Sequence, residues 1–474
     1  MWDINKNLYK TEIKMAKNKV IKGYDMTVGN PIVIILKYSF PLLLGSILHQ
    51  FYNMADSIIV GNFVGKTALA AVGTTGVVLW MAESIFIGFS AGAMILVSQY
   101  YGANEHTKLE NVINACCAIT NIISIPVILI GIFSSKFLLR AMNVPADAFD
   151  QAHIYLVISF LGLAPTIGYS LNAGFLRGMG DSRSPLKFLI TSTIINIILD
   201  FTFVAVFKWD VIGVAAATAI AQFIAWFYSM VFIKKHYNWL DIKPISIKCD
   251  MHIVKEMVKL GLPIGINELL FSSGVMLLQS IVNTHGSSFM AGYNVASKLD
   301  ALGFMSVDAL FLAVTTFVGQ NIGAKKYDRV RSTVLPSIVV SSVIVETITC
   351  LLVIFGRPLM HLFTPESAVI EAGYAYLIRV MPFYAIVAAF NMLYGFMQGA
   401  GETVIPTLVN LISIWIVRLP SAYILNTTGA NNIFFCYSCG WIFNLILSII
   451  LFNRNKVKRK VYGNNEYTQV NNLK

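Results

Sequence analysis

The stretch GFLRGMGDSRSP, at residues 174–185, returns 221 positions later as GFMQGAGETVIP, at residues 395–406. Five of the twelve positions are identical, and three more pair Leu with Met, Asp with Glu and Ser with Thr. The same offset superposes VSQYYGA (97–103) on VGQNIGA (318–324). Self-similarity at one fixed offset indicates a duplicated unit, here of about 220 residues.

The composition is that of an integral membrane protein. Mean hydropathy is +0.69, 56% of the residues are hydrophobic and 12% are charged, which excludes an ordinary soluble domain. Twelve apolar runs reach or approach the ~20 residues that a membrane-spanning helix needs. The runs are 32–64, 77–97, 113–133, 155–176, 188–207 and 211–233 in the first half, and 260–282, 290–318, 334–355, 374–397, 407–425 and 433–452 in the second.

Six spans per half bring both halves into the membrane from the same side, so the repeats are parallel. We predict an all-α integral membrane fold of twelve transmembrane helices, in two parallel six-helix repeats around a central cavity. The predicted parts are a cytoplasmic N-terminal segment (1–31), an N-lobe (32–233), a cytoplasmic linker (234–259), a C-lobe (260–452) and a basic cytoplasmic tail (453–474).

The positive charges of the chain are concentrated in segments that alternate with the predicted spans and lie on one side of the membrane. With both termini inside, the inner segments carry 26 Lys and Arg and the outer loops carry five. This is a strong positive-inside bias, and it accounts for the net charge of +11 without nucleic acid as a partner. We predict a multi-pass protein of a prokaryotic plasma (inner) membrane, in contact with lipids, with both termini cytoplasmic. Residues 1–31 are polar, so no cleavable signal peptide is expected.

The residues give no sign of an enzyme. P-loop, HExxH and zinc signatures are missing from the sequence, and the seven His form no ligand-spaced cluster. Cys436-x-x-Cys439 lies inside a span without a second pair nearby, which favours packing over metal or redox chemistry. We expect no catalytic residues and no cofactor apart from a coupling ion.

Asp56 is the first candidate functional residue. It lies midway along the first span, in HQFYNMADSIIVG, where an ionisable group costs several kcal/mol unless it faces a cavity or a partner. Asn53 is expected to share its helical face, with Gln50 a further turn away, so both are candidates for a substrate or coupling role. The alternative is that Asp56 only bonds a neighbouring helix.

Asp200, in NIILDFTFVAVF, is the second candidate, with Asn196 one turn before it on the same face. Two oxygen-bearing side chains stacked in this way make half of a cation site, or a proton-titrating carboxylate with a neutral partner. Thr218 can add a hydroxyl and Tyr155 a phenol. The alternative is that Asn196 and Asp200 cap a helix end near the outer loop.

The second half and the prolines add further candidates. Glu268 is the leading acid of the second half, with Gln279 as a further residue of the cavity. Asp300 and Asp308 with Lys298 are expected to form an internally neutralised group, and Arg418 to counter an acid such as Glu268. Because Pro removes a helical hydrogen bond, Pro41 marks a place where the helix of Asp56 can bend.

The chain resembles the multidrug and toxic compound extrusion (MATE) family over nearly all of residues 30–452. The resemblance is carried by these motifs: Pro41 with ADSIIVGNFVGKTALAAVG (55–73), VSQYYGAN, GFLRGMGDSRSP, NIILDFTF, VGQNIGAKK and GFMQGAGETVIP. The DinF-like branch fits best, because its N-lobe cation or proton site matches the following residues: Asp56, Asn196, Asp200, Thr218 and Tyr155. In that branch the first four imply a Na⁺ site.

The resemblance implies export of amphipathic, often cationic drugs in exchange for Na⁺ or H⁺, by a protein that we expect to be a monomer. One departure stands out. The branch that resembles NorM pumps places an acid in the tenth span, where this chain has Val387, so Glu268 lacks that partner. A lipid-linked oligosaccharide flippase of the same superfamily is the alternative; it would line its cavity with several basic residues.

The candidate site breaks the internal repeat. At the offset of 221 or 222, Asp56 corresponds to Leu278, Asn196 to Val417, Asp200 to Ser421 and Thr218 to Cys439. Only Tyr155 keeps its counterpart, Tyr376. This loss of symmetry points to the first lobe as the place where ions bind.

Overall fold

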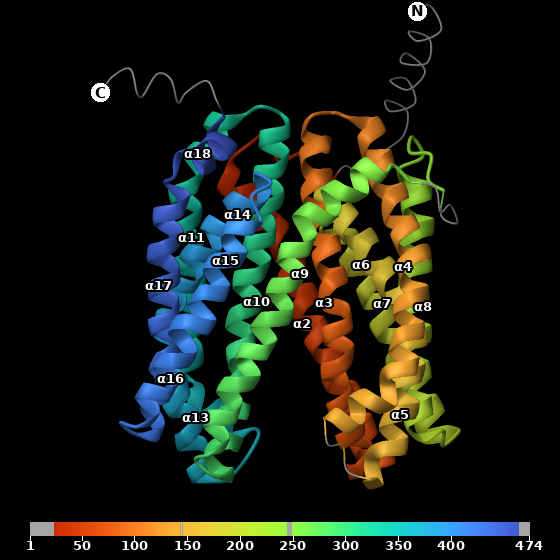
Figure 1. The fold of residues 1–474 in the computed structure, drawn as a ribbon, viewed down its shortest axis with the longest axis vertical. Coiled ribbons are helices and arrows are strands. Elements are labelled where there is room, and N and C mark those ends of the chain that lie inside the picture. The colour runs from red at the N-terminus through yellow and green to blue at the C-terminus, as the bar shows by residue number, and fades with distance from the viewer. Residues whose placement is uncertain (1–22, 143, 145, 244–248, 464–474) are drawn as a thin grey trace, which may run out of the picture. The chain divides into compact units, whose positions relative to one another are not determined.

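The chain folds into helices alone over the part that the computed structural model describes, residues 23–142, 144, 146–243 and 249–463 (Figure 1). Within these ranges, eleven helices are long and apolar enough to cross a membrane, and one bent helix pair supplies a twelfth span. The prediction of an all-α protein with twelve spans is therefore confirmed.

The chain divides into two units. The first is built on Leu44–Lys259, and the second combines Met26–Leu43 with the residues from Leu260 onward. The helices that begin in the first half are α2 (Pro31–Ile59), η1 (Val60–Val64), α3 (Lys66–Gly102), α4 (His106–Ala141), α5 (Ala146–Leu161), α6 (Leu163–Gly178), α7 (Arg183–Asp200), η2 (Phe201–Val206) and α8 (Asp210–His236).

The second half repeats this order with a few additional short helices. Its helices are α9 (Met251–Asn283), α10 (Ser287–Gly323), α11 (Tyr327–Ile354), α12 (Gly356–His361), α13 (Ser367–Val380), η3 (Met381–Phe383), α14 (Tyr384–Gly399), α15 (Val404–Ile412), η4 (Ser413–Arg418), α16 (Leu419–Asn426), η5 (Ala430–Phe434), α17 (Phe435–Phe452) and α18 (Asn455–Tyr462).

The duplication extends to the backbone dihedral angles. Four residues with positive φ in the first half have counterparts with positive φ exactly one repeat later, at the same offset of 221 residues. The pairs are Gly65 and Gly286, Asn104 and Lys325, Gly180 and Gly401, and Lys208 and Gly429. Because positive φ is uncommon outside glycine, four matched positions show that the turns between helices were copied along with the helices.

The repeated glycines of the opening motif bring two helices into close contact. A Cβ atom on Gly178 would lie 2.7 Å from the carbonyl oxygen of Met94 on α3. One repeat later, a Cβ on Gly399 would lie 2.6 Å from the carbonyl oxygen of Thr315 on α10. Small residues are what allow membrane helices to approach this closely. The motif therefore fixes the packing of the second span against the fourth in each half.

The fourth span is broken, whereas the sequence suggested one continuous run over 155–176. Helices α5 and α6 meet at Gly162 with a bend of 47°. The tenth span has its own interruption one repeat later, the 3₁₀ turn η3 at Met381–Phe383. Pro165 follows the break at Gly162, and Pro382 lies within η3. Proline has no amide hydrogen, so each interrupts the helical hydrogen-bond ladder.

The start of α2 is held by the second unit. Gln320 accepts a hydrogen bond from the Met26 backbone amide at 3.0 Å, and Asn321 donates one to the Met26 carbonyl at 3.0 Å. Lys326 Nζ donates to the Thr27 carbonyl at 2.8 Å. The polar residues of VGQNIGAKK therefore anchor the segment that leads into the first span. Pro41 is buried within α2, three residues before the chain enters the first unit at Leu44.

Candidate functional site

The candidate site is built on two irregular helices of the first unit. Asp56 lies near the end of α2, directly before the π-helical segment η1, and Asp200 is the last residue of α7, directly before the π-helical segment η2. The two π-helical segments pack against each other. Such segments are rare overall but are common at functional sites, because each changes the direction of the side chains around it.

The carboxyl groups of Asp56 and Asp200 lie close enough to act electrostatically on each other. Asp200 is fully buried and Asp56 is 9% exposed. Two ionised carboxylates about 4 Å apart repel each other by about 4 kcal/mol at the effective dielectric of a protein site. The pair therefore needs either a proton or a cation between its oxygens.

Neutral side chains from four helices complete the cluster. Asn196 on α7 donates from Nδ2 to Thr218 Oγ1 on α8 at 3.5 Å, a weak contact. Tyr52 on α2 donates to the same hydroxyl oxygen at 3.3 Å. Tyr155 on α5 is buried and lies within electrostatic range of both carboxylates. The structure thus brings together all five residues that the sequence analysis proposed for cation or proton coupling.

Several oxygens of the cluster lack a hydrogen-bond partner among the described residues. They are Asp56 Oδ1, Asn196 Oδ1, Asp200 Oδ1 and Asp200 Oδ2. Buried polar atoms are nearly always paired, so four orphaned acceptors at one place call for a ligand. Oxygen donors with negative charge suit a hard monovalent cation or a shared proton. The donor set therefore suits a Na⁺ ion or a proton.

Tyr52 was missed in the sequence analysis, which favoured Asn53 as the neighbour of Asp56. Tyr52 precedes Asp56 by one helical turn and is 8% exposed. Asn53 and Gln50 are instead on the exposed side of α2, with Asn53 Nδ2 at 3.5 Å from His49 Nδ1. The signal was present in the i, i+4 spacing of Tyr52 and Asp56.

The acids of the second unit form a separate group. Glu268 on α9 is half-buried and lies within electrostatic range of Asp308 on α10. Gln279, further along α9, donates from Nε2 to Asn283 Oδ1 at 2.7 Å. Val387, at the position of the missing tenth-span acid, is fully buried. Glu268 and Gln279 therefore do not belong to the cluster around Asp56.

Two expected pairings in the second unit are wrong. Lys298 does not neutralise Asp300; its Nζ lies 5.7 Å from the ring centre of Phe363. Arg418 acts electrostatically on the carboxylate of Asp300, and the acid that it counters is therefore Asp300 instead of Glu268. Arg418 and Asp300 belong to different helices and are 118 residues apart in the sequence, a separation that no local spacing encodes.

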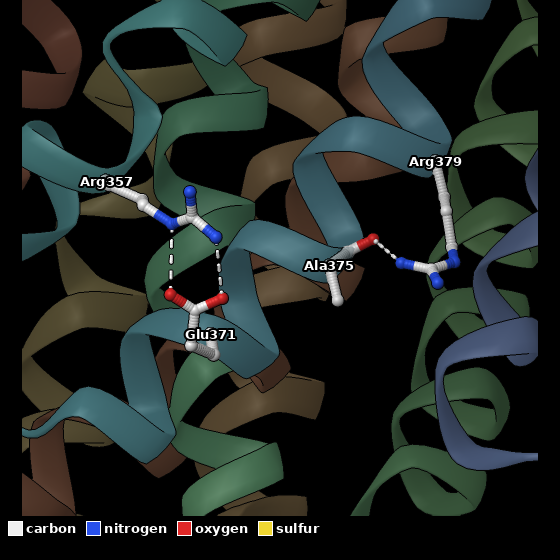
Figure 2. A network of polar contacts seen from close by, with 4 residues as sticks. All are labelled: Arg357, Glu371, Ala375 and Arg379. Carbon is white, nitrogen blue, oxygen red and sulfur yellow. Dashed lines mark hydrogen bonds and ion pairs between the residues drawn. The ribbon is translucent and has the colours of Figure 1, made fainter.

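A cavity of about 470 Å³ lies elsewhere in the second unit. Four of the residues that line it are drawn in Figure 2: Arg357, Glu371, Ala375 and Arg379. On one wall, Arg357 donates to both carboxylate oxygens of Glu371, at 3.0 and 2.9 Å, and stacks over Tyr374. On the other, Arg379 donates to the Ala375 carbonyl at 3.0 Å. Arg357 and Glu371 are exposed, and an exposed ion pair stabilises a fold by about 0–1 kcal/mol.

Among the residues that the structure describes, no group of three or more His, Cys, Asp or Glu side chains is placed to hold a metal ion. The cluster at Asp56 contains two carboxylates, with neutral oxygens as the remaining donors.

We expect Tyr52→Phe to weaken ion binding at the cluster. The change removes the phenol that donates to Thr218 and leaves the ring in place. A typical hydrogen bond contributes about 0.5–1.5 kcal/mol, so the apparent affinity for the coupling ion should fall about 2- to 10-fold. The half-saturating ion concentration for export by reconstituted protein checks this. Tyr423→Phe, on an exposed tyrosine of α16, is the matched control and should leave that concentration unchanged.

Comparison with known proteins gives one consistent result. The MatE family model matches residues 41–202 and again residues 263–424, once in each half of the chain. The chain is 29% identical over 404 residues to the probable multidrug resistance protein YpnP of Bacillus subtilis (strain 168), covering 84% of this chain and 89% of that protein. It is 25% identical over 407 residues to the probable multidrug resistance protein NorM of Thermotoga maritima, covering 82% and 85%.

Solved structures show the same fold. A crystal structure of MATE in the straight conformation matches with a TM-score of 0.85 and 22% identity, over 93% of this chain and 99% of that chain. The double family match and the shared fold both follow the internal repeat.

Proposed function

The chain belongs to the MATE family and is a multi-pass membrane transport protein; from this premise we propose that it is a secondary active antiporter. It exports amphipathic, often cationic small molecules in exchange for Na⁺ or H⁺. The relatives named as multidrug resistance proteins support the class of substrate. The single observation that carries the exchange is the buried pair of Asp56 and Asp200, with its orphaned oxygens.

The pair can act as a charge-dependent switch. Without a bound ion, the two ionised carboxylates repel each other, and both attract any cation that reaches them. A bound Na⁺ or proton removes that repulsion, and with it the attraction for a cationic drug. One ion and one organic cation then compete for the same negative charge, which is the condition for exchange.

Helix α2 connects this switch to a place where the chain can bend. Asp56 and Pro41 lie on the same helix, and Pro41 precedes the point at which the chain passes from the second unit into the first. A change of charge at Asp56 can therefore favour one of two shapes of α2, since the proline leaves the helix without one backbone hydrogen bond.

The remaining features follow from the charge pattern and the ligand chemistry. We place the protein in a prokaryotic plasma membrane with both termini cytoplasmic, as the positive-inside bias favours. We propose that it acts as a monomer among membrane lipids, without catalytic activity. An acidic cluster in the first unit suits cationic ligands, which favours drug export over the flipping of a pyrophosphate-linked oligosaccharide.

Transport by everted membrane vesicles tests the proposal. A fluorescent organic cation is supplied outside, and gradients of Na⁺ and of protons are imposed separately. We expect one of the two gradients to drive accumulation of the cation inside the vesicles. Vesicles that respond to neither gradient, while containing folded protein, would contradict the antiport mechanism.

We expect Pro41→Ala to slow exchange while leaving ion binding intact. Alanine restores the missing backbone donor and stiffens α2. The maximal export rate should fall with little change in the half-saturating ion concentration, because the carboxylates are untouched. Pro336→Ala is the matched control, since Pro336 also lies inside a helix but on α11, away from the helix that carries Asp56. An equal loss of rate in both variants would argue against a role for bending at Pro41.

A further inference from the structure

The second unit has a buried cation at the place where the first unit has its two acids. Arg418 is the last residue of η4 on the eleventh span, and at the repeat offset of 221 it corresponds to Ile197, between Asn196 and Asp200. The repeated tyrosines mark the same location. Tyr155 lies within electrostatic range of the first unit's carboxylates, and its counterpart Tyr376 lies within range of Asp300.

The guanidinium of Arg418 is enclosed by aromatic rings. Its Cζ lies 4.7 Å from the ring centre of Tyr437 and 5.8 Å from that of Trp441. Arg418 is 7% exposed, and its Nε is buried with no hydrogen-bond partner among the described residues. Cation–π contact is the main compensation for removing this charge from water.

Asp300 on α10 supplies the opposite charge. Its Oδ1 accepts a hydrogen bond from the Tyr384 hydroxyl at 2.7 Å, and the ring centre of Tyr384 lies 5.4 Å from that of Trp441, one of the two rings beside Arg418. The charge of Arg418 also acts on the carboxylate of Asp300. Asp300 is half-buried, so part of its surface stays accessible. No hydrogen bond or contact ion pair joins the two within the described part of the chain. The interaction therefore depends on charge and on the ring walls, without a fixed bidentate geometry.

A carboxylate with aromatic walls is the arrangement that proteins use to bind organic cations. We propose that the second lobe contains such an organic-cation site, formed by Asp300, Tyr437 and Trp441, and that the chain's own Arg418 occupies it. The chemical class of its ligand is an organic cation with a guanidinium or a substituted ammonium group. This site uses none of the residues of the carboxylate pair in the first lobe, and it would exist even if the proposed exchange at Asp56 and Asp200 were wrong.

Chemical rescue in the purified full-length protein tests the site by binding alone. Arg418→Ala removes the internal ligand and should lower the midpoint of thermal unfolding. Millimolar methylguanidinium chloride should then raise that midpoint in a saturable way, by more than an equal concentration of NaCl. The wild-type protein should not respond, because its site is filled.

Two controls assign the response to the site. Arg418→Ala combined with Asp300→Asn should not respond to methylguanidinium, because the attracting charge is gone. Arg379→Ala removes another arginine of the same unit that lies over an aromatic ring, with 5.8 Å from its Cζ to the centre of Phe435, and it should show no rescue (Figure 2). A missing response in Arg418→Ala, or a response that survives Asp300→Asn, would overturn the proposal.

If Arg418→Ala cannot be purified, the double variant decides. When Arg418 is the counter-charge of Asp300, neutralising both should restore the yield of folded protein. A double variant that is as unstable as Arg418→Ala alone would show that Arg418 acts only through packing, and would reject the site. None of these outcomes depends on transport, so failure here and failure of the antiport mechanism remain distinguishable.

Discussion

Asp200→Asn should abolish ion-coupled export and at the same time raise the thermal stability of the protein. The amide keeps the shape of the side chain but removes one of two charges that attract the coupling ion. Loss of a carboxylate at a buried cation site should lower ion affinity about tenfold or more, which is at least about 1.4 kcal/mol. Removing a buried charge and its repulsion from Asp56 also removes a cost to folding.

Opposite changes in function and stability separate a functional residue from a structural one. Export by everted vesicles and the midpoint of thermal unfolding are measured on the same preparation. Asp56→Asn should behave in the same way. Glu371→Gln is the matched control, because it neutralises an exposed carboxylate in the other unit. Asp200→Asn protein that is unstable but still couples export to an ion would remove this residue from the site.

Gly178→Ala should destabilise the first unit. The added Cβ would lie 2.7 Å from the Met94 carbonyl oxygen and 2.7 Å from Val97 Cβ. Both belong to α3, so relief requires the two helices to move apart. Over-packing of this kind costs about 1–3 kcal/mol.

The internal repeat offers a second position for the same experiment, and Gly73 on α3 offers a control. Gly399→Ala should cost a similar amount, since its Cβ would meet Thr315 of α10 in the same way. Gly73→Ala has open space around its Cβ and should be neutral or slightly stabilising. The midpoint of thermal unfolding in detergent gives all three values. Similar midpoints for Gly178→Ala and Gly73→Ala would contradict the close packing.

Much of this fold could be predicted from local sequence, because a membrane span needs only length and apolar composition. The twelve runs and the repeat of GFLRGMG were sufficient for the architecture. The size of the bend at Gly162 could not be predicted, since a hydrophobic run reads the same whether its helix is straight or bent. From the sequence, the turns of the two halves could be matched only through their repeated motifs. The positive φ angles that they share are a property of the folded backbone.

The candidate site was predicted unevenly for a related reason. Asp56 and Asp200 stand out because charge is rare in a span, whereas Tyr52 does not, since an aromatic residue in an apolar helix is ordinary. Local spacing offered both Tyr52 and Asn53 as neighbours of Asp56. The choice between them depends on which side of α2 faces α8, and that is decided by tertiary packing. The pairing of Arg418 with Asp300 is also a property of the packed helices.

Release of the coupling ion on drug binding tests the central claim most directly. Purified protein in weakly buffered detergent solution is titrated with a tight-binding organic cation, while a pH electrode and a Na⁺-sensitive dye follow the solution. The account predicts that wild-type protein releases Na⁺ or protons as the drug binds, and that the Asp56→Asn and Asp200→Asn double variant releases neither. Drug binding to the wild-type protein without release of either ion would contradict competition at the carboxylate pair.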